Sequence, residues 1–205
     1  MSVSIKALRQ TSAERAGIEL DTGEEIKASL SLIAELRLYA GKVLEETELE
    51  ALRSSAGLAL CKTRAVELLS YRPMSAKELR DKLEQKGEAA ENAAAAVDWL
   101  QEKGLLDDGR YAGMVVRHYA GKGYGPGRVR QELQRRGIPR ELWEAALEQL
   151  PEQDDKIESF LRARLRDPED RAQVQKVSAA LIRRGFSWEE IRAALARFRA
   201  DGEEY

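Results

Sequence analysis

Apolar positions recur with helical spacing in three consecutive stretches of the chain, and each stretch ends in a glycine. Gly87, Gly137 and Gly185 are spaced 50 and 48 residues apart. Aliphatic residues stand eight and four positions before each glycine: Leu79 and Leu83, Val129 and Leu133, Val177 and Leu181. This spacing predicts a short amphipathic helix, and a glycine directly after it is the residue that most easily adopts the left-handed cap conformation.

Two further helices are predicted in each copy. Apolar residues coincide ten and thirteen positions after each glycine: Val97 and Leu100, Leu147 and Leu150, Leu195 and Phe198. Pro139 suits the start of this helix in the second copy, and Ser187 with Glu190 has the spacing of a capping box in the third. Amphipathic stretches, "CKTRAVELLSY", "RYAGMVVRHYA" and "KIESFLRARL", precede the pairs. Each copy therefore reads as three helices.

Three-helix units of this size cannot bury their apolar faces alone, so neighbouring units are expected to stack. The predicted fold class is all-α, an elongated array of three tandem three-helix repeats with a small N-terminal β-hairpin segment. The predicted boundaries are 1–46 for the N-terminal hairpin and helix, 47–104 for repeat 1, 105–150 for repeat 2 and 151–205 for repeat 3.

The N-terminal segment has a different pattern. "RAGIELDTGEEIKASL" alternates apolar and polar residues on both sides of the turn-like "DTGE", which predicts a small hairpin or meander. A helix is predicted from Ser29 to Tyr39. Thr47 with Glu50 is interpreted as a capping box that starts the next helix.

The stretch "GKGYGPGR" at residues 121–128 raises the question of a phosphate-binding loop. Lys122 is followed by Gly123, whereas a P-loop needs Ser or Thr there, and the spacing of the dinucleotide-binding fingerprint is also absent. Gly121 and Gly123 can end one helix, and Pro126 can begin the next. We interpret this stretch as a turn between helices.

Composition restricts the chemistry further. The chain has 205 residues, a net charge of −2, one cysteine and one histidine. It has no apolar run of membrane-spanning length and no secretory signal, so a cytoplasmic protein without membrane contact is expected. Cys61 is interpreted as a buried apolar residue and His118 as a partly exposed helix residue. One cysteine and one histidine cannot form a nitrogen and sulfur ligand set, so no metal and no cofactor are expected.

Charge is strongly banded, and residues 117–140 carry seven basic residues and one acidic residue. Arginine can grip phosphate or carboxylate with a planar fork, so this band suits nucleic acid or an acidic protein surface, with a merely solvated helix face as the alternative. The candidate partner-binding or DNA-binding residues are the seven basic residues and the tyrosine in the glycine turn: Arg117, Lys122, Tyr124, Arg128, Arg130, Arg135, Arg136 and Arg140.

Other residues receive structural interpretations. Tyr111 and Tyr119 lie on an apolar stripe and are expected in the core, whereas Tyr124 fits either packing or display to a partner. Asp107 and Asp108 are interpreted as helix caps. Packing between repeats is predicted for the tryptophans: Trp99, Trp143 and Trp188. Contact with a basic partner is the interpretation for the acidic residues Asp154, Asp155 and Glu158.

No carboxylate pair has a base, nucleophile or phosphate loop near it in the sequence, so an enzyme is not expected. The stretches "YRPMSAKELRDKL", "LDDGRYA", "KGYGPGRVRQELQRRGI" and "WEAAL" together resemble the RecX family, regulators of the RecA recombinase. The resemblance is strong over residues 61–150. One departure is Glu88, which stands where the other two copies have Ile138 and Phe186.

The resemblance implies a protein that binds RecA filaments on single- or double-stranded DNA and restrains strand exchange, ATP hydrolysis and co-protease activity in DNA repair and the SOS response. A monomer is expected, because stacked repeats bury their own faces. Two alternatives remain open: a helix-turn-helix-like transcription regulator and a helical scaffold that contacts only proteins.

Overall fold

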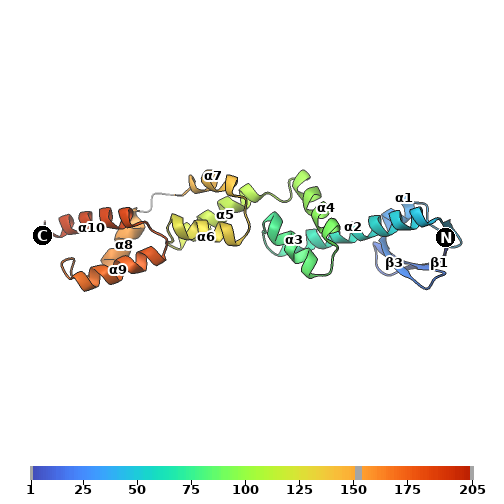
Figure 1. Cartoon of the computed structure of the whole chain (residues 1–205), viewed down its shortest axis with the longest axis horizontal. Helices are drawn as coiled ribbons and strands as arrows, with labels where there is room; N and C mark the ends of the chain where they lie inside the picture. Colours follow the sequence, from blue (N-terminus) through green and yellow to red (C-terminus); the bar gives the residue numbers. More distant parts are fainter. Residues whose placement is uncertain (1, 151–153, 204–205) are drawn as a thin grey trace. The chain divides into compact units, whose positions relative to one another are not determined.

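The computed structural model describes residues 2–150 and 154–203 (Figure 1). The chain forms two compact units, one of Met1–Met74 with Glu78–Leu106 and the other of Ser75–Lys77 with Asp107–Tyr205. The prediction of a mainly helical chain with three tandem three-helix groups and a small N-terminal strand segment is confirmed.

The N-terminal segment is a four-stranded antiparallel sheet in the order β3-β2-β1-β4. Its strands are β1 (Val3–Gln10), β2 (Arg15–Leu20), β3 (Glu25–Ser29) and β4 (Val43–Leu44). The predicted hairpin is β2 and β3, with Gly23 in the turn at φ 88°. Ile5, Ile18 and Leu20 on one face pack against Leu49 and Leu52 of the following helix. The sheet thus has its own core, built on the start of that helix.

Two helices follow the sheet. Helix α1 (Leu30–Glu35) begins at the predicted Ser29 cap but ends before Tyr39, since Arg37 turns out of the helix with φ 48°. Helix α2 (Glu46–Tyr71) is continuous through the start of the first repeat. The capping box predicted at Thr47 and Glu50 is wrong, because Glu45 is the N-cap and Glu48 accepts its backbone N–H at 3.0 Å. Thr47 therefore lies inside the first turn.

The remaining helices form the three groups. The second half of α2 precedes α3 (Ala76–Gln85) and α4 (Ala90–Glu102). The middle group is α5 (Asp108–Gly121), α6 (Pro126–Arg135), the 3-10 helix η1 (Arg140–Leu142) and α7 (Trp143–Leu147). The third is α8 (Asp154–Arg164), α9 (Arg171–Arg183) and α10 (Trp188–Glu203), at the orange and red end of Figure 1.

The predicted caps and core positions of the repeats are confirmed. Gly87, Gly137 and Gly185 have φ values of 88°, 65° and 92°, which an L side chain rarely adopts. The apolar pairs before them are buried: Leu79 and Leu83, Val129 and Leu133, Val177 and Leu181. Ser187 and Glu190 exchange side-chain to backbone hydrogen bonds of 2.6 and 3.2 Å as a capping box.

The tryptophans do not fill contacts between repeats as predicted. Trp188 is 54% exposed, and Trp143 donates to the Ile138 carbonyl and packs on the core of its own group. Trp99 is half-buried, with the Lys62 ammonium 5.0 Å from its ring centre. All three tryptophans lie in the helical segment that follows the cap glycine of their repeat, but the side chains around each one determine how far it is buried.

Candidate partner-binding surface

The eight candidate residues all lie on the middle group, between α5 and η1. Five of them are exposed: Arg117, Lys122, Arg130, Arg135 and Arg140. Tyr124, Arg128 and Arg136 are half-buried. The cations therefore divide into a fully exposed set and a set that is built into the protein.

The single acidic residue of the basic band, Glu132, pairs with the two half-buried arginines and also with the exposed Arg135. Its side chain is only 5% exposed on α6, and it pairs with Arg128 at 3.2 Å and with Arg135 at 2.8 Å. Arg136 lies 4.0 Å away and donates to the Tyr111 hydroxyl. This role of Glu132 was not predicted from the sequence, although its spacing of three and four residues from the arginines is the signal for such pairs on a helix.

Electrostatics keeps the Glu132 carboxylate charged. Burial by itself raises the pKa of Glu132, but hydrogen bonds from Arg135 and Tyr119, with the charges of Arg135 and Arg128, outweigh it, so the pKa lies below its usual value. Three arginines thus share one buried negative charge. Their guanidinium groups are partly neutralised before any partner arrives, so they contribute less to phosphate binding than their number suggests.

The aromatic residues of α5 and the glycine turn pack inside the group. Tyr111 is buried, and Tyr119 packs against the same core, as expected. The Tyr124 ring lies 5.6 Å from the Tyr119 ring, with the Arg128 guanidinium 6.0 Å from its centre. Of the two interpretations of Tyr124, packing is the one that these contacts favour.

The exposed cations have weak or solvent-accessible contacts. Arg117 donates to Gln149 at 3.0 Å, and Arg130 lies 3.7 Å from Glu144, whose side chain is 78% exposed. Arg140 lies over the Trp143 ring at 5.7 Å, and Lys122 lies 6.0 Å from the Tyr119 ring centre. Exposed pairs of this kind are worth little in water, so these side chains can turn to a partner at low cost.

The glycine turn forms a close backbone contact with the third group, which we call the Gly125 contact. Gly125 N–H donates to the Arg184 carbonyl and Gly127 N–H to the Gly185 carbonyl, each at 2.9 Å. A Cβ on Gly125 would lie 2.7 Å from the Gly185 carbonyl oxygen. Two glycines of the turn are therefore required for this approach, and they hold the basic group against the third repeat.

A similar contact, the Ser75 contact, lies at the start of α3. The buried Ser75 hydroxyl donates to the Arg136 carbonyl, and a Cβ on Gly137 would overlap Lys77. The Ala76 N–H donates to Asp108 at 2.8 Å. Asp107 caps α5 as predicted, whereas the buried Asp108 carboxylate caps the backbone of α3.

The carbonyl that precedes the first cap glycine is also occupied. The Arg64 guanidinium donates to the Lys86 carbonyl at 3.4 Å and forms an ion pair with Glu88. Glu88, which stands in place of the apolar Ile138 and Phe186 of the other repeats, therefore positions an arginine. A polar end of this kind is typical of the first unit of a repeat array.

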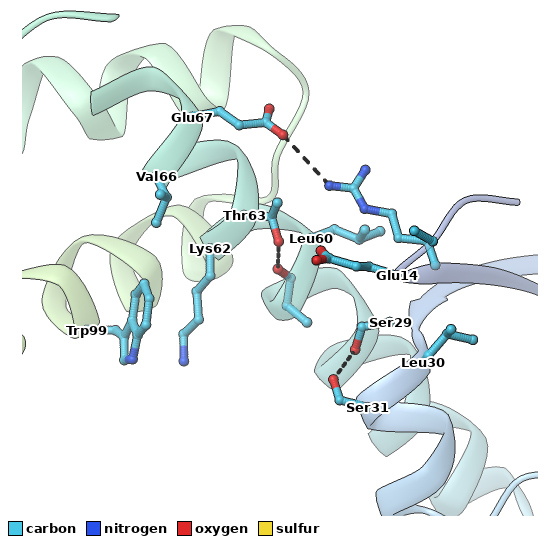
Figure 2. Close-up of a pocket in the computed structure, with 13 residues that line it drawn as sticks. Glu14, Ser29, Leu30, Ser31, Leu60, Lys62, Thr63, Val66, Glu67 and Trp99 are labelled. Atoms are coloured by element: carbon cyan, nitrogen blue, oxygen red, sulfur yellow. Dashed lines mark hydrogen bonds and ion pairs between the residues drawn. The ribbon is translucent and has the colours of Figure 1, made fainter. Parts of the chain in front are cut away.

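A hollow of about 690 Å³ in the first unit lies between the sheet and α2 (Figure 2). Figure 2 shows Lys62 and Trp99 on one side of it and Ser29, Leu30 and Ser31 on another. Its lining mixes apolar, hydroxyl, acidic and basic side chains. This lining gives no preference for one kind of ligand.

Within the described ranges 2–150 and 154–203, no three His, Cys, Asp or Glu residues are placed to hold a metal ion. No helix in the same ranges is long and apolar enough to cross a membrane.

Cys61 is fully buried as expected, and burial raises the pKa of its thiol to about 11. His118 is an exposed residue of α5. Among the acidic candidates, Glu158 pairs with Arg197 at 3.2 Å, and the side chain of Asp154 lies outside the described ones.

Three helical groups in tandem, two of them joined by backbone hydrogen bonds, define a tandem helical-repeat protein with a basic middle repeat. Family models of RecX match in order along the chain: its first three-helix domain at residues 61–100, its second at 107–147 and its third at 151–195. The chain belongs to the RecX family.

Individual relatives agree with this assignment. "Regulatory protein RecX" of Halorhodospira halophila is 34% identical over 160 residues, covering 73% of this chain and 96% of the relative. That of Xanthomonas axonopodis pv. citri is 41% identical over 134 residues, covering 64% and 83%. A crystal structure of regulatory protein RecX matches with a TM-score of 0.72 at 27% identity, covering 93% of this chain and 99% of that one. RecX from Lactobacillus salivarius, at 23% identity and a TM-score of 0.64, covers 71% and 99% and supports the fold.

Proposed function

We propose that this protein binds RecA filaments on DNA and restrains their ATP hydrolysis, strand exchange and co-protease activity. Membership of a regulatory family supports this, and the resemblance of "YRPMS" and "GYGPGR" to RecX gives the partner. The observation that carries the proposal is the exposed cationic set on the middle repeat, which can meet DNA phosphates or acidic protein in a filament.

The internal pairs of Glu132 sharpen which residues serve the partner. Arg117, Lys122, Arg130 and Arg140 are the proposed contact residues, whereas Arg128, Arg135 and Arg136 hold the surface in shape through Glu132. Contact with about four phosphates would give a slope of log affinity against log salt of roughly −3 to −4 on duplex DNA. Tyr124 supports the turn through its packing on Tyr119.

Filament ATPase activity tests the function directly. RecA filaments on single-stranded DNA are titrated with the purified protein, and inhibition is expected. Inhibition far below one regulator per RecA subunit would favour action at filament ends or through disassembly over groove occupancy. Wild-type ATPase rates at saturating protein would reject the proposed function. Salt-sensitive binding to a defined DNA site would then point to the transcription regulator, and nuclease-resistant partner binding to the protein-only scaffold.

Charge reversal tests the surface. The triple variant Arg117→Glu, Arg130→Glu, Arg140→Glu should weaken filament inhibition about tenfold or more, since each lost phosphate contact removes part of the electrostatic affinity. The matched control reverses three exposed cations of the third repeat, Lys176, Arg183 and Arg192, for the same change in net charge. Equal loss in both variants would show that only net charge matters, and unchanged inhibition in the first would reject the surface.

A further inference from the structure

The third repeat has an apolar groove between α9 and α10. Its volume is about 320 Å³. It is lined by Arg171, Val174, Gln175, Ser178, Ala179, Ile182, Trp188 and Arg199. Ile182 is 51% exposed and Trp188 is 54% exposed, so two large apolar side chains stand in solvent at one site. Adjacent exposed apolar residues of this size mark interaction sites more often than isolated ones do.

The second repeat provides an internal reference for this groove. A shift of 48 residues, the spacing of the cap glycines, relates four groove positions to polar residues of α6 and η1. The pairs are Arg130 and Ser178, Gln131 and Ala179, Gln134 and Ile182, Arg140 and Trp188. The first repeat has Arg80, Asp81, Glu84 and Ala90 at these positions. Only the third repeat has a large apolar residue at each of the two positions held by Ile182 and Trp188. The groove is therefore a specific feature of this repeat.

The groove also corresponds in sequence register to a face of the second repeat that is already in contact with another repeat. Pro126 and Gly127 of the second repeat, which are covered by the Gly185 turn, correspond to Val174 and Gln175. In the second repeat, a helix turn with an apolar Phe186 covers this face. In the third, nothing among the described residues covers Ile182 and Trp188 to a similar extent.

Ser178 gives independent evidence for an occupant. It is 3% exposed, and its hydroxyl has no hydrogen-bond partner among the described residues. A buried hydroxyl without a partner costs stability, and most such groups in proteins are satisfied. A bound backbone group that reached the groove would supply the missing hydrogen bond.

Charge at the rim selects the kind of occupant. Arg171 and Arg199 line the groove, and no acidic residue does. Arg199 already binds the Pro168 carbonyl at 2.9 Å and pairs with the exposed Glu169 at 3.4 Å. Both Arg199 and Arg171 are exposed, so their guanidinium groups are accessible to a partner. A second copy seated on the same groove by twofold symmetry would bring four arginines together against only two Glu169 carboxylates, an excess of positive charge. Trp188 offers one flat ring on which a nucleobase could stack, but the rest of the apolar lining, Val174, Ala179 and Ile182, is aliphatic and favours an apolar protein side chain.

We propose that this groove docks an acidic protein segment, with one apolar side chain seated between Ile182 and Trp188 and its flanking carboxylates on Arg171 and Arg199. Backbone atoms of the segment satisfy Ser178. The inference rests on the proposed function in one respect, since it assigns this segment to the protein component of the filament. The basic middle repeat and this groove then make two separate contacts, the first electrostatic and the second apolar.

The double variant Ile182→Gln, Trp188→Arg tests the groove with the residues that the second repeat carries at the same positions. Binding to RecA filaments assembled on oligo(dT) with a non-hydrolysable ATP analogue should weaken about 10- to 100-fold, as for loss of a tryptophan-centred contact. Binding to free oligo(dT) should stay unchanged or become stronger, because the variant gains a positive charge. Met114→Gln, which removes an exposed apolar residue of α5, is the matched control.

Other outcomes are distinct. Unchanged filament affinity in a folded double variant would overturn the groove assignment while leaving the proposed function intact. Equal loss of filament and free-DNA binding would identify nucleic acid as the occupant, and a concentration-dependent dimer abolished by the variant would identify a second copy; either result overturns the proposal. Failure of the wild-type protein to bind filaments would reject the proposed function and with it the filament as source of the segment. Arg171→Glu should also weaken filament affinity, and the fold should be retained in this variant because Arg171 is exposed.

Discussion

The Ser75 contact and the Gly125 contact occupy the same register in successive repeats but are made by different chemical groups. In one, a serine hydroxyl donates to the Arg136 carbonyl; in the other, the backbone N–H of a glycine donates to the Arg184 carbonyl. Each acceptor is the carbonyl that precedes a cap glycine. A helix end exposes such carbonyls, so each must find a donor, and the comparison shows that the fold preserves the acceptor and varies the donor.

The first repeat extends this comparison. Its carbonyl at Lys86 accepts from Arg64, and Glu88 holds that arginine. A charged side chain from α2 therefore takes the place of another repeat. At the opposite end, the third repeat has the exposed Ile182 and Trp188 instead of a polar closure. The first repeat is thus closed by charge and the third has exposed apolar side chains, which gives these two repeats different binding properties.

The largest expected effect comes from Gly125→Val, which would disrupt the Gly125 contact, the one made by backbone N–H groups. The backbone of Gly125 has φ −80°, which valine tolerates, so the cost arises from the overlap of its Cβ with Gly185. We expect a loss of about 2–4 kcal/mol in the free energy of unfolding, from overpacking and two weakened hydrogen bonds. Urea denaturation measures it.

The control for this variant is Gly121→Ala, because a Cβ there meets no atom within 4 Å. It should leave stability unchanged or raise it by about 0.5–1 kcal/mol, as for glycine to alanine in a helix. A valine at position 125 with wild-type stability and wild-type filament inhibition would show that the contact is dispensable.

A smaller effect is expected from Ser75→Ala, which removes the serine hydroxyl of the Ser75 contact and leaves the Arg136 carbonyl without this donor. The free energy of unfolding should fall by about 1–2 kcal/mol, since Ser75 is fully buried. Thermal denaturation beside Ser70→Ala, whose hydroxyl is exposed, measures the difference. Equal melting temperatures for the two variants would contradict a structural role for the Ser75 hydroxyl.

The smallest effect is expected from Arg64→Met, which removes the charged closure of the first repeat. The Arg64 side chain is 44% exposed, so water can replace much of what it provides, and a loss of about 0.5 kcal/mol is expected. The loss should shrink further in 1 M salt, whereas the control Arg80→Met should show no salt-dependent change. A larger loss in the free energy of unfolding for Arg64→Met than for Ser75→Ala would contradict the expected ranking of these contacts.

Sequence patterns located most helices because their determinants are local. The apolar pairs Leu79 and Leu83, and their equivalents, lie four residues apart on one helix face, and the cap glycines follow directly. The sheet was predicted only as a small hairpin or meander, because β4 has two residues and pairs with β1 from about forty positions away. The Glu132 cluster was predictable from its spacing, but its burial was not.

The sequence by itself determined the repeats, their cap glycines, the basic band and the RecX family, since each depends on residue type and short spacing. Tertiary structure decided which arginines remain available, because the core of the middle repeat buries Glu132 and draws three of them to it. It also decided that Ser75 meets Arg136, 61 residues away, and that Trp188 stays exposed. Such outcomes depend on which helix ends and faces come into contact in the folded chain. A local sequence pattern does not specify these distant neighbours.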